Sequence, residues 1–335
     1  MGVDRESIPS VAARVRPVQA GAPVVGIHFL KETAAFVLGE EALLLAAREG
    51  EPQRLAVHGG AILSSASDGT RVVTGGDDGK VVSTGADGDS ETVATDAKHR
   101  WIDHVALGPS GAVAWSAGRQ AFARAGKGAE KSLEVVSTVG GLAFAPKGFR
   151  LAIAHYNGAT LWFPNAKADP ETLEWKGSHL GAKFSPDGRF LVTSMQEPML
   201  HGWRLDDRKD MRMSGYASRV RSLGWTADGK WLATSGSNQV VLWPFGGKDG
   251  PMGKQPQLRA PSEQQADVVA CHPKQSVVAV GFADGLVLLV RTDDGAEILG
   301  RKPGGEPVTA LAWSASGKLL AFGTESGEAG ILDLA

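Results

Sequence analysis

Short apolar runs alternate with turn residues along this chain, in a pattern typical of β-strands. In residues 222–243, "SLGWTADGKWLATSGSNQVVLW", three apolar runs are separated by the turn segments "ADG" and "SGSNQ". Apolar runs bounded by Gly, Asp, Asn and Ser predict strands joined by tight turns. The stretch therefore predicts three antiparallel strands, and the variable segment that follows it predicts a fourth.

The same pattern recurs along almost the whole chain, every 36 to 46 residues. Eight frames align on the end of the first strand, at Phe29, Ser65, Leu107, Phe144, Phe184, Trp225, Cys271 and Trp313. A repeat of this length with three or four strands is typical of a β-propeller, which arranges four-stranded sheets radially. We expect residues 1–335 to form a single all-β domain with eight four-stranded blades. Seven blades are the alternative, because the third frame has a short second strand.

Several frames share a more specific motif. The segment "FSPDGRFLVTS" (184–194) combines a Pro-Asp-Gly turn with a following strand, and Trp162 and Trp243 occupy the third-strand position of their repeats. These features resemble the WD-repeat β-propeller family, although the Trp-Asp and Gly-His dipeptides of that family are absent from the sequence.

The resemblance implies a buried hydrogen-bond set of His, Ser or Thr, Asp and Trp in each repeat. Only the second repeat approaches it, with His58, Thr74 and Asp77 or Asp78, of which we choose Asp77, and with Ser83 near the tryptophan position. We expect the other blades to be held together by apolar packing, in which Trp162, Trp203 and Trp243 are structural.

Two segments fall outside the repeated pattern. The last frame stops after its third strand, so its blade lacks an outer strand. Residues 11–18, "VAARVRPV", are predicted to supply that strand, pair with the blade that contains Trp313 and Leu332, and close the ring. Residues 246–267 are rich in Gly, Pro and Gln and are predicted to form a long surface loop.

Charge and composition narrow the classes of partner. The formal net charge is −2 with both signs mixed along the chain, which disfavours nucleic acid as a partner. No apolar run is long enough to cross a membrane, and residues 1–21 lack the apolar core of a secretory signal. With Cys271 as the single cysteine, no intramolecular disulfide can form. We expect a cytoplasmic protein, a monomer, with no nucleic-acid or membrane partner.

No motif indicates catalysis, a metal or a cofactor. The segment "TGGDDGK" (74–80) lacks the first glycine and the final Ser or Thr of a phosphate-binding loop. The acidic pairs near Asp87 and Asp293 lack the further carboxylates of a calcium loop. Among His99, Asp103 and His104, strand geometry allows at most two side chains to converge. Cys271 is interpreted as a core residue.

One group of turns carries residue types common in binding sites. In a propeller, the turns before the first strand and between the second and third strands of each repeat lie on one face, the top face. Here they carry Arg100, Trp101, His155, Tyr156, Met195, Glu197, Met199, Tyr216 and Arg219. Aromatic residues and Arg are enriched in binding hot spots, whereas simple turns favour Gly, Asn, Asp and Ser. The resemblance implies a non-catalytic scaffold that binds a protein or peptide there. The alternative is a propeller that binds a small ligand or metal at its central channel and is an enzyme.

Overall fold

The computed structural model describes residues 8–335, and their regular structure is almost entirely β. Residues 1–7, which begin the segment expected to lack a secretory signal, lie outside the described residues. Contacts within the chain divide it into two compact units. Unit 1 contains residues 8–55 and 216–335, and unit 2 contains residues 56–215.

Unit 1 contains four antiparallel sheets of four strands each. The first sheet consists of β2 (Val24–Leu30), β3 (Thr33–Leu38), β4 (Ala42–Ala46) and β5 (Gln53–Ala56). The next two consist of β20 (Leu223–Trp225), β21 (Trp231–Thr234), β22 (Val240–Pro244) and β23 (Gln257–Arg259), and of β24 (Ala266–Cys271), β25 (Val277–Phe282), β26 (Val287–Arg291) and β27 (Glu297–Arg301). The fourth consists of β28 (Val308–Trp313), β29 (Leu319–Thr324), β30 (Glu328–Asp333) and β1 (Val15–Gln19).

The middle strands of these sheets are largely apolar, and most of their residues are buried on both faces of the sheet. All five residues of β4 are buried, and so are the first four of β26. One core cluster joins Phe36 and Leu44 of the first sheet to Ala321 and Ile331 of the last. Burial on both faces explains why these strands are continuous apolar runs rather than alternating ones.

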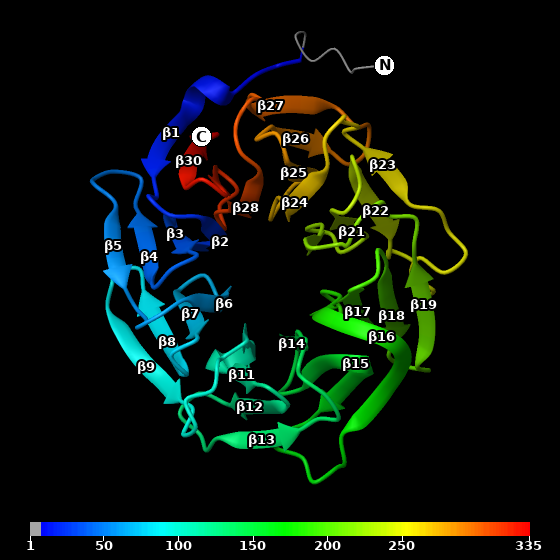
Figure 1. Ribbon diagram of the computed structural model, residues 1–335. Helices are drawn as coiled ribbons and strands as arrows, with labels where there is room; N and C mark the ends of the chain where they lie inside the picture. Colours follow the sequence, from blue (N-terminus) through cyan, green and yellow to red (C-terminus); the bar gives the residue numbers. More distant parts are fainter. Residues whose placement is uncertain (1–7) are drawn as a thin grey trace. The chain divides into compact units, whose positions relative to one another are not determined.

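The predicted closing strand is confirmed, with corrected bounds. β1 pairs antiparallel with β30, from Val15 opposite Leu332 to Gln19 opposite Glu328, and Figure 1 shows it at the outer edge of that sheet. The strand does not span 11–18, because η1 (Ala12–Arg14) forms a 3-10 turn just before it. The last sheet therefore combines three strands from the end of the chain with one from its beginning.

Unit 2 contains two four-stranded sheets and one six-stranded sheet, all antiparallel. The four-stranded sheets consist of β6 (Ile62–Ser67), β7 (Arg71–Gly76), β8 (Lys80–Gly85) and β9 (Ser90–Thr95), and of β10 (His104–Leu107), β11 (Val113–Ala117), β12 (Gln120–Arg124) and β13 (Lys131–Glu134), with η2 (Pro109–Gly111) between β10 and β11. The six-stranded sheet consists of β14 (Gly141–Phe144), β15 (Leu151–Trp162), β16 (Glu171–Phe184), β17 (Phe190–Met195), β18 (Leu200–Arg204) and β19 (Lys209–Met213).

The expectation of eight blades is wrong, because residues 8–335 form seven hydrogen-bonded sheets. The repeats at Phe144 and Phe184 share the six-stranded sheet. Its strand β16 pairs with β15 through its N-terminal part and with β17 through its C-terminal part. Gly158 and Gly177 have positive φ values of 142° and 119°, and the strands β15 and β16 continue through them. Eight sequence repeats are thus distributed over seven sheets.

The segment 246–267 is not a loop throughout. Turns occupy its first part, but β23 lies within it and pairs with β22, from Arg259 opposite Val240 to Gln257 opposite Leu242. The segment also includes Ala266, the first residue of β24. Residues 246–256 therefore form the loop that precedes β23, the outer strand of this sheet.

Candidate functional site

Several loops of unit 2 are joined by hydrogen bonds into one row. The Asp103 carboxylate accepts a bond from the Gly118 amide at 3.2 Å, and the Val139 amide donates to the Gly118 carbonyl at 2.9 Å. Further along, the Ser137 hydroxyl accepts a bond from the Tyr156 amide at 2.9 Å. We name these segments the unit 2 loop row, which comprises residues 96–103, 117–120, 135–140, 155–158, 176–179 and 195–199. Residues 155–158 and 176–179 belong to β15 and β16, where each strand changes its pairing partner.

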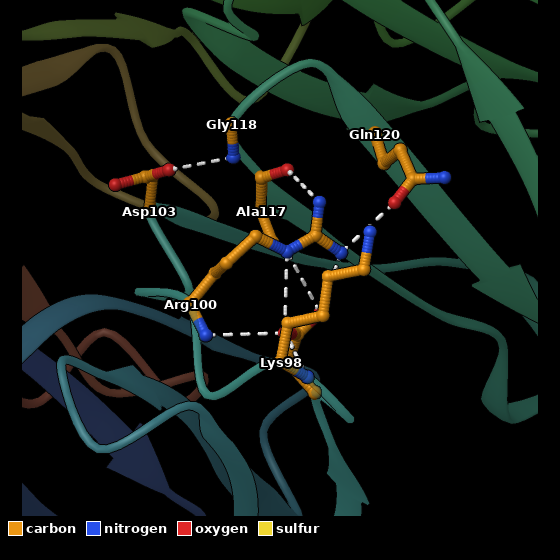
Figure 2. Close-up of polar contacts among 7 residues, drawn as sticks. Lys98, Arg100, Asp103, Ala117, Gly118 and Gln120 are labelled. Atoms are coloured by element: carbon orange, nitrogen blue, oxygen red, sulfur yellow. Dashed lines mark hydrogen bonds and ion pairs between the residues drawn. The ribbon is translucent and has the colours of Figure 1, made fainter.

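Arg100 is held firmly within this row (Figure 2). Its guanidinium donates to the Asp96 carboxylate at 2.6 Å, to Gln120 Oε1 at 2.9 Å and to the Ala117 carbonyl at 3.4 Å. Hydrogen bonds from Arg100 lower the pKa of the buried Asp96 to about 2. Arg100 was a candidate binding residue, but with its donors used in this way it supports the loop rather than offering a free cation.

Three large apolar side chains are exposed on the same row. The exposed fraction is 61% for Trp101, 57% for Tyr156 and 78% for Val136. Trp101 and Tyr156 were among the sequence candidates, whereas Val136 was missed because a single valine before a turn carries no distinctive signal. Neighbouring loops of one unit thus expose an apolar set on backbone that hydrogen bonds hold in place.

The other candidates in this row differ in accessibility. His155 is buried, with Nε2 2.9 Å from Thr160 Oγ1 and Nδ1 donating to the Tyr156 carbonyl. Met195 is also buried, Met199 is half-buried and Glu197 is exposed. His155 and Met195 therefore support the fold, and only Glu197 adds an exposed polar group.

Tyr216, a candidate in unit 1, is part of a buried hydrogen-bond chain. The Trp243 indole donates to the Tyr216 hydroxyl at 2.6 Å, and that hydroxyl lies 2.8 Å from Thr234 Oγ1. Burial raises the pKa of Tyr216 to about 12. Arg219, the other candidate in unit 1, is half-buried. Tyr216 is therefore a structural residue and not a contact residue.

The second repeat contains the hydrogen-bond set that the sequence suggested. His58 Nε2 lies 2.8 Å from Thr74 Oγ1, and His58 Nδ1 lies 3.0 Å from the Asp78 carboxylate. Asp78 and not Asp77 makes this contact, so the choice of Asp77 as the structural residue is corrected. The backbone geometry of the turn decides which of two adjacent aspartates faces the imidazole.

Comparable sets occur in other repeats, so apolar packing is not their only support. His179 Nδ1 lies 2.7 Å from Thr193 Oγ1, and the Tyr216 chain occupies the same kind of position in unit 1. These sets were missed because a tyrosine replaces the histidine in one of them and because no Gly-His dipeptide marks the other.

The three structural tryptophans are all buried, as is His201. His201 stacks on Trp175 with ring centroids 4.1 Å apart and meets the edge of Trp203 at 4.7 Å. Burial lowers the pKa of His201 to about 3, which keeps the imidazole neutral near pH 7. His201 is thus packed as an aromatic ring within the core of unit 2.

Two of the three residues considered as metal ligands make other hydrogen bonds. His99 is exposed, Asp103 accepts the Gly118 amide, and His104 Nε2 donates to the Val139 carbonyl at 3.1 Å. Within residues 8–335, no cluster of three or more His, Cys, Asp or Glu side chains has the geometry to hold a metal ion. The same part of the chain has no helix with the length and apolarity required to span a membrane.

Comparisons with known proteins agree with the repeated architecture. A family model described as "WD domain, G-beta repeat" matches residues 209–244, and one described as "Anaphase-promoting complex subunit 4 WD40 domain" matches residues 269–335. None of the curated proteins compared with the sequence matches it. The crystal structure of the computationally designed Ika8 protein is similar, with 16% sequence identity, a TM-score of 0.75, and coverage of 94% of this chain and 97% of that one. At this identity the likeness shows the fold alone.

Proposed function

We propose, from the premise that this chain belongs to the WD-repeat β-propeller family, that it is a non-catalytic scaffold that binds another protein or a peptide. WD-repeat propellers commonly serve as protein-interaction scaffolds. The observation that carries the proposal is the exposed set of Trp101, Val136 and Tyr156 on the unit 2 loop row. This set is the contact surface, and Glu197 adds a polar group at its edge.

The anchoring of these loops favours tight binding. Ordering a flexible loop on binding opposes association, and hydrogen bonds that already hold the loop reduce that cost. Arg100 fixes the backbone beside Trp101, and Ser137 fixes the amide of Tyr156. Exposed aromatic residues on ordered backbone are typical binding hot spots, each of which contributes about 2 kcal/mol or more.

The charge of the chain bears on the class of partner that it binds. The balanced charge favours a protein partner over nucleic acid or a membrane surface. We propose a cytoplasmic monomer that uses no cofactor. Its activity consists of holding a partner, without a chemical step.

Affinity purification with a double variant tests the proposal. Trp101→Ala with Tyr156→Ala removes both exposed rings, and we expect recovery of specific partners to fall at least about tenfold, the effect of losing about 1.4 kcal/mol. The measurement is quantitative mass spectrometry of proteins that co-purify with the tagged chain.

Leu258→Ala is the matched control, because Leu258 is an exposed apolar residue of unit 1, outside the loop row. It should leave partner recovery unchanged, and circular dichroism should show that all variants are folded. Equal recovery of partners by the double variant and the unaltered chain would rule out the loop row as the binding surface.

A further inference from the structure

A groove in unit 1 is separate from the surface proposed above. It has a volume of about 660 Å³ and lies between the β24–β27 sheet and the sheet that β1 completes. Leu289 and Ile298 line one side, and Trp313 and Leu334 line the other. The N-terminal segment borders it, since the Val11 amide donates to the Leu299 carbonyl at 2.9 Å.

The floor of the groove is apolar and only partly covered. Val11, Val277, Trp313 and Leu334 are partly buried and pack on one core cluster of unit 1. Ile298 is 38% exposed. The Trp313 indole donates to the Ala270 carbonyl at 3.0 Å, which satisfies its polar atom and leaves the ring available for apolar contact. A groove of this size and lining can accept a bulky apolar side chain.

The rim of the groove is positively charged. Lys274, Lys318 and Arg291 line it, together with Glu297. Arg291 is bound to Asp294 at 2.7 Å. Among the described residues, no hydrogen bond or ion pair engages the ammonium group of Lys274 or Lys318, and both residues are exposed. Two free ammonium groups beside an apolar floor complement a segment that carries both carboxylates and an apolar side chain.

A single histidine fixes both lysine-bearing turns. His272 Nδ1 accepts the Lys274 amide at 3.0 Å, and His272 Nε2 donates to the Gly317 carbonyl at 3.1 Å. Gly317 has φ of 78°, and a Cβ at this position would overlap the His272 ring, so glycine is required there. The turns that carry Lys274 and Lys318 are therefore held together before any ligand binds.

A second, polar pocket extends the groove. It has a volume of about 350 Å³, shares Lys274 and Gln275 with the groove, and reaches Thr226 and Asp228 in the preceding repeat. The two hollows together border the turns between first and second strands of three successive repeats. An occupant that fills both must be extended rather than compact.

We propose that this groove is a second docking site, which binds an extended acidic peptide segment of a partner protein. A bulky apolar side chain of the segment packs against Ile298 and Trp313, and its carboxylates contact Lys274 and Lys318. The site lies on unit 1, on a different class of turn from the unit 2 loop row. It therefore does not depend on the function proposed for that row.

Selection from a random peptide display library on the full chain tests this proposal. We expect enriched peptides to contain a Leu, Ile, Phe or Met flanked by Asp or Glu. Synthetic copies of the enriched peptides should bind at least about tenfold more weakly to Lys274→Glu with Lys318→Glu, measured by fluorescence polarisation, because two attractive charges become repulsive. Ile298→Gln should weaken binding about threefold to tenfold, since it removes apolar contact without changing charge.

Two controls separate this site from the other surface. Lys248→Glu with Lys302→Glu makes the same charge change at exposed lysines outside the groove and should leave binding unchanged. Trp101→Ala with Tyr156→Ala should also leave it unchanged, whatever its effect on other partners. Enriched peptides without acidic residues, or equal affinity for the Lys274 and Lys318 variant, would overturn the proposal. So would a concentration-dependent dimer that this variant abolishes, because the groove would then bind a second copy of the chain.

Discussion

The two tyrosines of this protein were both candidate contact residues and have opposite roles. Tyr156 in unit 2 is 57% exposed, whereas Tyr216 in unit 1 is 8% exposed. The Tyr216 hydroxyl lies between the Trp243 indole and Thr234 Oγ1. Beside Tyr156, the preceding residue His155 takes the inward position and contacts Thr160. Tyr216 is thus structural because a threonine and a tryptophan of nearby strands contact its hydroxyl. Tyr156 remains available for binding because the adjacent His155 makes the contact with a threonine instead.

The largest effect should come from removing the buried ring. Tyr216→Ala leaves a cavity and an unpaired Trp243 indole N–H, so we expect the free energy of unfolding to fall by about 4 kcal/mol. Tyr156→Ala should change it by less than about 0.5 kcal/mol, because that ring is exposed. Urea denaturation followed by tryptophan fluorescence measures both.

Tyr216→Phe refines this comparison. It keeps the ring and removes only the hydroxyl, and the expected loss is about 1–2 kcal/mol. If Tyr216→Ala and Tyr156→Ala destabilised the protein equally, the assigned division between a structural and an exposed tyrosine would be wrong.

The second-largest effect concerns the hydrogen-bond set of the second repeat. Asp78→Ala removes the carboxylate that contacts His58 Nδ1, and we expect a loss of about 1–2 kcal/mol. Asp77→Ala is the matched control in the adjacent position and should cost less than about 0.5 kcal/mol. Thermal unfolding of the two variants distinguishes them, and a larger effect of Asp77→Ala would contradict the observed contact.

An effect of similar size concerns Arg100 beside Trp101. Arg100→Ala leaves the buried Asp96 carboxylate without its main partner, so we expect a loss of about 1–2 kcal/mol at pH 7, whereas Trp101→Ala should cost less than about 0.5 kcal/mol. Because the pKa of Asp96 is lowered to about 2, this stabilisation is present above its ordinary value near 4 and is lost as the pH falls through about 2.

Chemical denaturation between pH 7 and pH 2 measures this dependence. The difference in unfolding free energy between Arg100→Ala and the unaltered chain should shrink below about pH 4. A difference that stayed constant down to pH 2 would show that the Asp96 contact is not its source.

Much of the fold could be predicted from short patterns. The repeated apolar runs indicated the all-β propeller architecture, and the missing last strand indicated that the N-terminal segment would pair with the final sheet, as β1 does. Strand pairing within a hairpin depends on residues only a few positions apart, so short patterns of apolar and turn residues can predict it. The sheet count was wrong because β15 pairs with both β14 and β16, and β16 pairs with both β15 and β17, so two repeats share one sheet.

The candidate site was predictable only in part. The sequence alone identified the repeats, and residue type and position in the repeat made Trp101, Tyr156 and Tyr216 candidate binding residues. Only the tertiary structure decided that Tyr216 is buried, that Asp78 rather than Asp77 contacts His58, and that Lys274 and Lys318 border one groove. The physical reason is distance along the chain. Tyr216 contacts Trp243, 27 residues later, and His272 contacts Gly317, 45 residues later. Whether such partners face one another depends on how separate strands and sheets pack together, which a local pattern does not encode.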